Sequence, residues 1–305
     1  MNAIELSNVN YSSDQFNLKN ISFKVPQGFV TGFIGRNGAG KTTIIRLIMD
    51  LYQPQTGVIR VLEEDMALNP IELKNRIGFV YAENYFNERW TTKQLEKMIA
   101  PFYRKWDHQV FEFYLEKFDL PINKSIKTFS TGMKMKLSLA VAFSHHAELY
   151  IFDEPTSGLD PIARNELLEI IQQELIDENK TIFMSTHIIS DLEKIADYII
   201  HLSGGEVILN GSKEQLLQRY QVVSGAIEDL DDELASLLIY EEHKRTGFIG
   251  LTEHAQVFKE ILGHKVNITT PSIENLMVYL EKRKPKYHEN IKLMEEGFYN
   301  EGIVN

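Results

Sequence analysis

The sequence contains no cysteine, no long apolar run and no excess of basic residues. Without cysteine the chain cannot form a disulfide or a thiolate metal site, which fits a reducing compartment. No apolar stretch approaches the roughly 18–20 residues of a membrane-spanning helix, and the N-terminal residues lack the basic segment and apolar core of a signal peptide. The net charge of −11 argues against general binding to nucleic acid, because that affinity comes largely from Lys and Arg on phosphates.

The distribution of apolar residues predicts an α/β protein with a mainly parallel core sheet. Residues 77–80, 149–152 and 181–185 have the apolar character of buried strands, and residues 161–178 have that of an amphipathic helix. Strands that alternate with helices in this way are typical of a parallel sheet.

The 305 residues suffice for one large domain and a smaller one. We expect the large domain to span residues 1–220, because the character of the chain changes after that point. Residues 221–284 are predicted to form a small α+β domain, and residues 285–305 a loosely held tail.

The segment GRNGAGKT, residues 35–42, follows the apolar run 29–34 and precedes a predicted helix from Thr42 to Met49. Strand, glycine-rich loop and helix in this order are typical of a phosphate-binding loop. Glycine allows successive N–H groups to turn toward an anion, and the helix adds its positive N-terminal end. Lys41 can then reach the β- and γ-phosphates, and the Thr42 hydroxyl can bind Mg²⁺. A chance glycine-rich turn is the alternative, which the flanking strand and helix disfavour.

Two carboxylates, Asp153 and Glu154, end the apolar strand 149–152. At the end of a parallel strand, Asp153 would lie at the crevice where ligands bind and hold Mg²⁺ through its water shell. Glu154 can polarise an attacking water as a general base. An acidic loop after a core strand is the structural alternative, and the phosphate loop upstream favours the functional one.

Two further segments can supply groups to the same place. Ser130 is a predicted N-cap of a helix with Gly132 in its first turn, and this helix start can receive an anion. A simple capped helix explains the same residues. His187 follows the strand 181–185, and a neutral imidazole there can bind a γ-phosphate or order the attacking water. A lone histidine is usually structural, but this one is delivered by a third strand end.

These motifs together resemble those of the ATP-binding subunits of ABC transporters, over roughly residues 1–220. The resemblance implies a P-loop NTPase fold of the ABC ATPase type, with a mixed, mainly parallel core sheet and an antiparallel β subdomain. It also implies a helical subdomain at about residues 84–145. ATP and Mg²⁺ are the implied cofactors, and the implied activity is ATP hydrolysis coupled to transmembrane transport.

The resemblance assigns a role to each motif. Tyr11 resembles the aromatic residue that stacks on adenine, Glu154 the catalytic base, His187 the switch histidine and Asp160 the D-loop carboxylate at a dimer interface. The implied nucleotide-binding residues are Gly35, Asn37, Gly38, Ala39, Gly40, Lys41, Thr42 and Thr43. The implied magnesium ligands are Thr42 and Asp153. The implied signature motif, which binds the ATP held by the opposite subunit, comprises Ser130, Thr131 and Gly132.

The sequence departs from the family pattern in two places. The usual signature is Leu-Ser-Gly-Gly-Gln, whereas Thr131 replaces a Gly and Met133 replaces the Gln. The family also places a Gln after the strand 77–80 to ligate Mg²⁺, and Ala82 occupies that position here. Glu83, one residue further on, is the candidate substitute.

In the resembling family the helical subdomain accepts a helix of the membrane subunit. Aromatic residues crowd residues 81–118, and Tyr85, Phe86 and Trp90 are the candidates to face a partner, because large aromatic rings suit such grooves. A helical core that packs through aromatics is the alternative for most of them. The implied partners are a membrane-spanning subunit on a separate chain and a second ATPase, in a homodimer or heterodimer at the cytoplasmic face of the membrane.

The chain most resembles the ATPases of exporters of drugs or of antimicrobial and cytolytic peptides, such as phenol-soluble modulin exporters. The features that carry this resemblance are the altered signature, the missing Gln and the acidic C-terminal appendage. A soluble ABC ATPase acting on ribosomes or DNA is an alternative, although no second cassette, coiled coil or basic surface is evident. A small-molecule kinase would have no use for the motifs at 130–132 and 157–160. A low-turnover regulatory module that is not coupled to transport is the remaining alternative.

Overall fold

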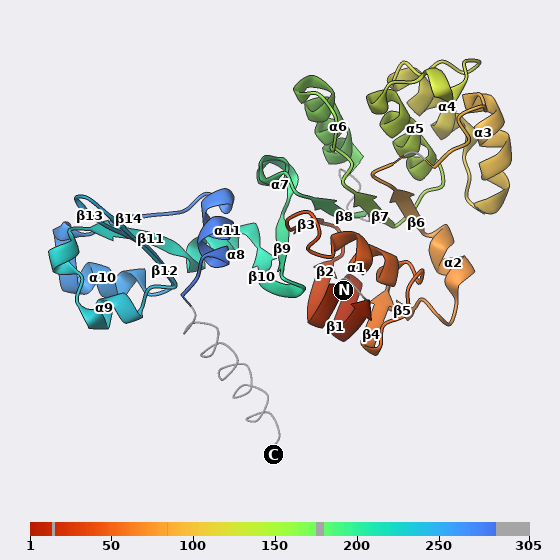
Figure 1. The fold of residues 1–305 in the computed structure, drawn as a ribbon. Helices are drawn as coiled ribbons and strands as arrows, with labels where there is room; N and C mark the ends of the chain where they lie inside the picture. The colour runs from red at the N-terminus through yellow and green to blue at the C-terminus, as the bar shows by residue number, and fades with distance from the viewer. Residues whose placement is uncertain (14–15, 84, 175–179, 285–305) are drawn as a thin grey trace. The chain divides into compact units, whose positions relative to one another are not determined.

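The computed structural model describes residues 1–13, 16–83, 85–174 and 180–284, which fall into two compact units (Figure 1). Contacts divide the chain into Met1–Gly211 and Ser212–Asn305. The sequence predicts a boundary after residue 220, which would place the helix α8 (Lys213–Arg219) in the first unit. The contacts place α8 in the second unit instead. The tail predicted for residues 285–305 lies outside the described residues.

A six-stranded sheet forms the centre of the first unit. In spatial order its strands are β10 (Glu206–Ser212), β9 (Tyr198–Ser203), β3 (Val30–Ile34), β8 (Thr181–Thr186), β7 (Leu149–Asp153) and β6 (Ile77–Val80). The pairs β9–β3, β3–β8, β8–β7 and β7–β6 are parallel. Every residue of β3, β7 and β8 is buried, as expected for continuous apolar strands covered on both faces. The predicted parallel core sheet is thereby confirmed.

A second, four-stranded sheet comprises β2 (Phe16–Pro26), β1 (Asn2–Ser13), β4 (Thr56–Val61) and β5 (Glu64–Asp65), in that spatial order. Its neighbouring strands are antiparallel, as expected from the resemblance to ABC ATPases, which have an antiparallel β subdomain. The helix α1 (Lys41–Ile48) buries its apolar side chains in one core with residues of both sheets. This shared core fixes the start of α1 between the two sheets.

A helical part lies between β6 and β7 in the sequence (Figure 1). The helices of this region are α3 (Thr92–Ile99), η1 (Ala100–Phe102), α4 (His108–Lys117), η2 (Ile126–Thr128) and α5 (Thr131–Phe143). Thr91 and Gln94 form a capping box at α3, and the Asp107 side chain caps α4, so local side chains accept hydrogen bonds from two N–H groups at each of these helix starts. The helical character predicted for this region is confirmed.

The described part of the first unit also contains the helices α2 (Pro70–Asn75), α6 (Pro161–Glu174) and α7 (Ile189–Ile195). The predicted helix 161–178 is thus present as α6, and residues 175–178 of that prediction lie outside the described residues. Within the described ranges, no helix combines the length and apolar character that crossing a membrane requires.

The second unit contains a four-stranded sheet in the spatial order β12 (Tyr240–Lys244), β13 (Gly247–Thr252), β11 (Gln221–Gly225) and β14 (Asn267–Thr269). Its helices are α8, η3 (Ile227–Asp229), α9 (Asp232–Ser236), α10 (Ala255–Leu262), η4 (Gly263–Lys265) and α11 (Ile273–Glu281). Along the chain, β11, α9, β12, β13, α10 and β14 follow the split βαβ order of a ferredoxin-like motif. Leu234 of α9 and Phe258 of α10 pack on Val223 and Phe248 of the sheet. This small unit has the α+β character that the sequence predicts.

Candidate nucleotide-binding site

The glycine-rich loop connects the end of β3 to the start of α1. Gly38 and Gly40 have φ angles of 82° and 107°, a left-handed region that residues with a Cβ rarely adopt. Gly40 is the N-cap of α1 and has no side chain to cap it. The first N–H groups of α1 therefore have no side-chain cap, which is the arrangement that binds an anion at a helix start.

Lys41 is the buried cation of this loop, with 5% of its surface exposed. Its Nζ donates hydrogen bonds to the carbonyl oxygens of Gly35 over 2.7 Å and Arg36 over 3.4 Å. The same Nζ lies 3.1 Å from Oε1 of Glu154. A buried charge requires such partners, and two backbone carbonyls and one carboxylate provide them here.

Asp153 connects the end of β7 to the phosphate loop. It is buried, its Oδ2 accepts a hydrogen bond from Thr42 Oγ1 over 3.1 Å, and its Oδ1 accepts one from Ser185 Oγ over 2.6 Å. Ser185 lies directly opposite Asp153 in the parallel pair of β7 and β8. A hydroxyl and a carboxylate oxygen that already meet beside a phosphate loop fit the hard oxygen donors that Mg²⁺ prefers.

Glu154 lies between Lys41 and His187. Its φ angle is 52°, a sparsely populated conformation for a residue with a side chain, and its N–H donates to Ser185 Oγ over 3.1 Å. Its Oε2 accepts a hydrogen bond from the backbone N–H of His187 over 3.2 Å and lies 2.6 Å from His187 Nδ1. One carboxylate thus joins the loop lysine to the histidine after β8, as a general base beside a phosphate would require.

The predicted signature residues lie at the start of α5. The Ser130 side chain accepts a hydrogen bond from the Met133 N–H over 3.2 Å and caps this helix. A Cβ placed on Gly132 would lie 3.8 Å from Leu159 Cδ2 and 3.9 Å from Ala163 Cβ, so this helix start lies against the loop that precedes α6. Thr131 is the first residue of α5.

Asp160 caps α6 through its Oδ1, which accepts hydrogen bonds from the N–H groups of Ile162 and Ala163 over 3.0 and 3.1 Å. In the described part of the chain, no hydrogen bond or ion pair connects Ser130 or Asp160 to the group formed by Lys41, Glu154 and His187. Within one copy, the two sets of motif residues are therefore not directly linked.

The segment in which the sequence lacks the expected Gln follows β6. Val80, the last residue of β6, pairs with Phe152. Tyr81 follows it directly, and its ring meets that of Phe79 edge to face with centres 4.1 Å apart. Partial burial raises the pKa of the Tyr81 phenol; Tyr85 and, more weakly, Asp153 add to the rise, and the charge of Arg46 opposes it. Glu83 is exposed, and its role as a Mg²⁺ ligand stays a prediction.

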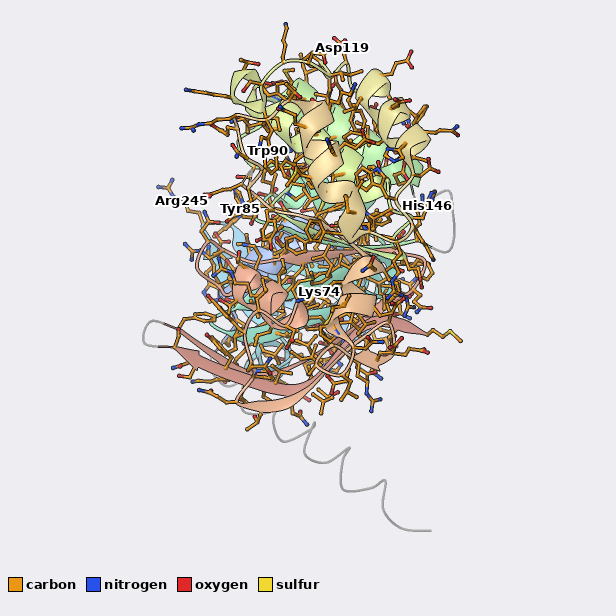
Figure 2. The ribbon with its side chains drawn as sticks, turned by 90° about the vertical axis from the view of Figure 1, so that its right-hand side faces the viewer. Lys74, Tyr85, Trp90, Asp119, His146 and Arg245 are labelled. Carbon is orange, nitrogen blue, oxygen red and sulfur yellow. The ribbon has the colours of Figure 1, made fainter. Side chains whose placement is uncertain are left out.

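The predicted partner-facing residues follow the same segment. Tyr85 is exposed, and Phe86 and Trp90 are partly buried; Tyr85 and Trp90 are labelled in Figure 2. Tyr81 and Tyr85 contact each other edge to face at 4.7 Å between ring centres. Further along, Phe111, Tyr114 and Phe118 are buried, which agrees with the alternative of a helical core for these three, whereas Phe102 and Phe113 are exposed.

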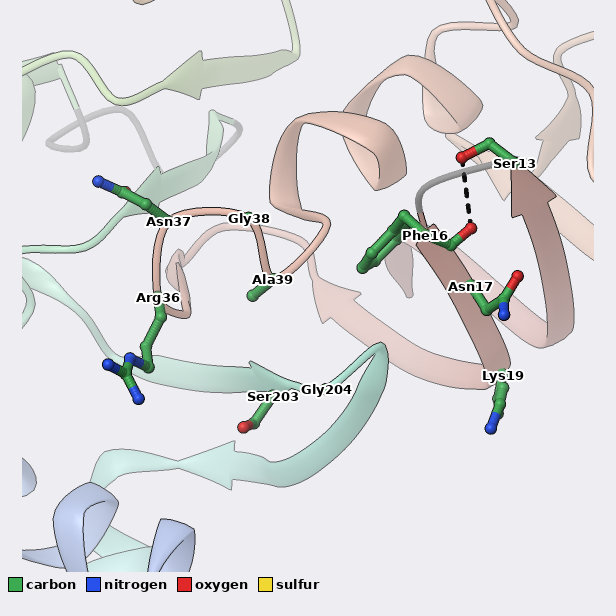
Figure 3. Close-up of a pocket in the computed structure, with 10 residues that line it drawn as sticks. All are labelled: Ser13, Phe16, Asn17, Lys19, Arg36, Asn37, Gly38, Ala39, Ser203 and Gly204. Carbon is green, nitrogen blue, oxygen red and sulfur yellow. Dashed lines mark hydrogen bonds between the residues drawn. The ribbon is translucent and has the colours of Figure 1, made fainter.

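A cavity of about 750 Å³ adjoins the phosphate loop (Figure 3). Its lining residues are Ser13, Phe16, Asn17, Lys19, Arg36, Asn37, Gly38, Ala39, Ser203 and Gly204. This volume lies in the range typical of small-molecule sites. The predicted adenine-stacking residue Tyr11 is not among these lining residues, whereas Phe16, Lys19 and Arg36, which sequence reasoning missed, are. The pairing of Ser13 with Phe16 across β1 and β2 brings these residues together, and sequence alone does not reveal that register.

A phosphate loop whose threonine bonds a strand-end aspartate, and whose lysine contacts the next glutamate, defines a P-loop ATPase. Comparisons with known proteins agree. The family model described as "ABC transporter" matches residues 18–157. The chain is 36% identical over 207 residues to the ABC transporter ATP-binding protein NatA of Bacillus subtilis, covering 66% of this chain and 84% of that protein. It is 32% identical over 231 residues to the bacitracin transport ATP-binding protein BcrA of Bacillus licheniformis, covering 75% of each.

The similarity also includes the second unit and known three-dimensional structures. The ABC transporter ATP-binding protein YtrB of Bacillus subtilis is 28% identical over 282 residues, which covers 92% of this chain and 91% of that protein. A solved structure of the ATP-binding subunit of an ABC transporter superposes with a TM-score of 0.64 at 28% identity, covering 70% of this chain and 91% of that one. The chain therefore belongs to the ABC transporter family, as an ATP-binding subunit that hydrolyses ATP coupled to transport.

Proposed function

We propose that this chain is the ATPase of an exporter that moves drugs or antimicrobial and cytolytic peptides across a membrane. The ATPase part rests on one observation, the linked group of Lys41, Thr42, Asp153, Glu154 and His187 at the strand ends. The cargo class is supported by the 32% identity to a protein named for bacitracin transport.

ATP binding is proposed to change the partners of Lys41. An ammonium group has three donors, and two of them already face the carbonyl oxygens of Gly35 and Arg36. The contact that the β- and γ-phosphates would replace is therefore the one to Glu154. Once Lys41 turns to the phosphates, the Glu154 Oε1 is free to accept a proton from the attacking water, while Oε2 remains bonded to His187.

Mg²⁺ is the proposed metal of this site, held by the Thr42 hydroxyl and, directly or through water, by Asp153. When bound, it would neutralise charge on the β- and γ-phosphates. The Ser185 hydroxyl keeps one oxygen of Asp153 hydrogen-bonded over 2.6 Å, and this contact orients the other oxygen toward Thr42.

Two ATPase subunits are proposed to enclose two ATP molecules, each bridging Lys41 of one copy and Ser130 of the other. The start of α5 is a helix N-terminus suited to an anion, and it is not bonded to the Lys41 group within its own chain. Asp160 at the start of α6 would lie near the same interface. The second subunit is either a copy of this chain or a sister chain.

A membrane-spanning subunit on a separate chain is the proposed partner of the segment containing Tyr85, Phe86 and Trp90. That partner would place the ATPase at the cytoplasmic face of the membrane. A soluble ABC ATPase or a low-turnover regulatory module is the second candidate, and the replacement of the expected Gln by Ala82 favours the low-turnover module.

Phosphate release by the purified chain, alone and in complex with a co-expressed membrane subunit of about six apolar spans, tests these proposals. The exporter proposal predicts ATP hydrolysis that rises with the membrane subunit and rises further with peptide substrate. Hydrolysis that never responds to a membrane subunit favours the soluble or regulatory candidate. The absence of any hydrolysis contradicts both the exporter ATPase and the role of Glu154 as a base.

A further inference from the structure

We propose that Phe16, rather than Tyr11, is the aromatic residue against which the base of the nucleotide stacks. This inference rests on the nucleotide-binding function proposed above and concerns only the part of the site that holds the base.

The Tyr11 ring is already engaged by another ring. It lies parallel to Tyr52, with ring centres 5.5 Å apart and 3° between the planes. Tyr52 is held in turn by Arg46, whose Nη1 donates to the Tyr52 hydroxyl over 2.8 Å and whose guanidinium carbon lies 5.5 Å from the ring centre. A base that stacked on this face of Tyr11 would have to displace Tyr52.

The backbone of Arg46, which holds this cluster, also lies away from the phosphate loop along α1. Arg46 belongs to the last turn of this helix, and the phosphate loop precedes its first residue, Lys41. Because a helix rises about 1.5 Å per residue, the Arg46 backbone lies roughly 7.5 Å further along α1 than that of Lys41.

Phe16, in contrast, lines the cavity together with the first residues of the phosphate loop (Figure 3). Its ring is directed toward that loop in Figure 3. A Cβ placed on Gly40 would come within 2.2 Å of Phe16 Cζ, so the ring rests where a side chain at Gly40 would lie. Contact with the loop backbone holds Phe16 in place before any base arrives, and such preorganisation favours binding.

Strand register explains why Phe16 takes this position. Tyr11 pairs with the buried Leu18, whereas Phe16 lies two residues earlier on β2, opposite Ser13. β2 is the edge strand of its sheet, and Lys19 of β2 donates its N–H to the carbonyl oxygen of Gly205, next to the cavity-lining Gly204. Side chains of β2 therefore reach the cavity, and β1 contributes only Ser13 among the described lining residues.

Binding of a non-hydrolysable ATP analogue, measured by calorimetry, tests this assignment. Phe16→Ala should weaken binding about 5- to 150-fold, the range expected for loss of one base–aromatic stack. Phe16→Tyr should restore it, because the π face returns. Phe16→Ala should weaken binding of the corresponding GTP analogue by a similar factor, since stacking does not depend on the hydrogen-bonding edge of the base. The matched control Tyr11→Leu should bind within about 2-fold of wild type, a change of under 1 kcal/mol.

Phe16 also touches the phosphate loop, so a second ligand separates the two effects. Inorganic tripolyphosphate has no base, and its affinity should be unchanged by Phe16→Ala if the ring acts by stacking. Equal losses for tripolyphosphate and nucleotide would mean that Phe16 only supports the loop and would overturn the inference. Loss of nucleotide binding in Tyr11→Leu with full binding in Phe16→Ala would also overturn it and leave the ATPase function standing. Failure of the wild type to bind nucleotide would instead refute the proposed function.

Discussion

Replacing the proposed base by its amide, Glu154→Gln, separates the chemical step from nucleotide binding. In the structure, Oε1 of Glu154 contacts Lys41 Nζ at 3.1 Å, and Oε2 contacts His187. The amide keeps the shape of the carboxylate, and its oxygen can still accept the hydrogen bond from the His187 backbone N–H. It cannot accept a proton from water, and it carries no charge to pair with Lys41.

The expected loss in kcat is about 10²- to 10⁴-fold, the usual contribution of a positioned general base, which corresponds to roughly 3–5 kcal/mol of the activation barrier. Nucleotide affinity should be retained or increased, because Lys41 no longer has to leave a carboxylate partner to reach the phosphates. The two side chains are 6% and 14% exposed, so solvent screens their contact only weakly. Binding that persists without hydrolysis should also favour a closed dimer with ATP.

Single-turnover phosphate release measures the chemical step, calorimetry measures binding, and light scattering measures the dimer. Glu5→Gln is the matched control, since Glu5 makes the same kind of ion pair with Lys24 over 3.2 Å on the antiparallel sheet and should leave all three readings unchanged. Turnover by Glu154→Gln at the wild-type rate would refute the assignment of the base. Weaker ATP binding would refute the proposed exchange of partners by Lys41.

Three further substitutions test other contacts. Lys41→Ala should weaken binding of the ATP analogue at least about 10-fold, or roughly 1.4 kcal/mol, and an unchanged Kd by calorimetry would contradict its role. Asp153→Asn keeps the shape at Thr42 but removes the charge, so half-maximal ATPase activity should need more Mg²⁺, and an unshifted Mg²⁺ titration would exclude Asp153 as a metal ligand. Arg76→Met should lower the free energy of unfolding at pH 7 by up to about 1 kcal/mol. Hydrogen bonding to Arg76 holds the pKa of Glu148 below its ordinary value, so this stabilisation is present above about pH 4.5 and is lost as the pH falls through the folded-state pKa. Urea unfolding should therefore show wild type and variant converging in acid, and a constant difference would contradict the pairing.

The local features of the site could be predicted because short segments determine them. Only glycine adopts the φ angles of Gly38 and Gly40 without strain, so the phosphate loop is visible in eight consecutive residues. The apolar run 149–152 followed by two carboxylates likewise indicates a buried strand with polar groups at its end. The residues around Ser130 predict that it caps a helix, and its side chain accepts the hydrogen bond from the Met133 N–H that such a cap makes.

The amino-acid order alone is enough to identify the motifs and the class of fold, whereas packing in three dimensions selects which side chains meet. Thr42 and Asp153 are 111 residues apart in the chain, and only the order of β3, β8 and β7 in one sheet brings them within hydrogen-bond distance. The contact of Lys41 with Glu154 and the position of Phe16 beside the phosphate loop depend in the same way on sheet order and strand register. These are set by packing between distant segments, because a side chain's own neighbours specify its backbone conformation but not the strand that will lie beside it.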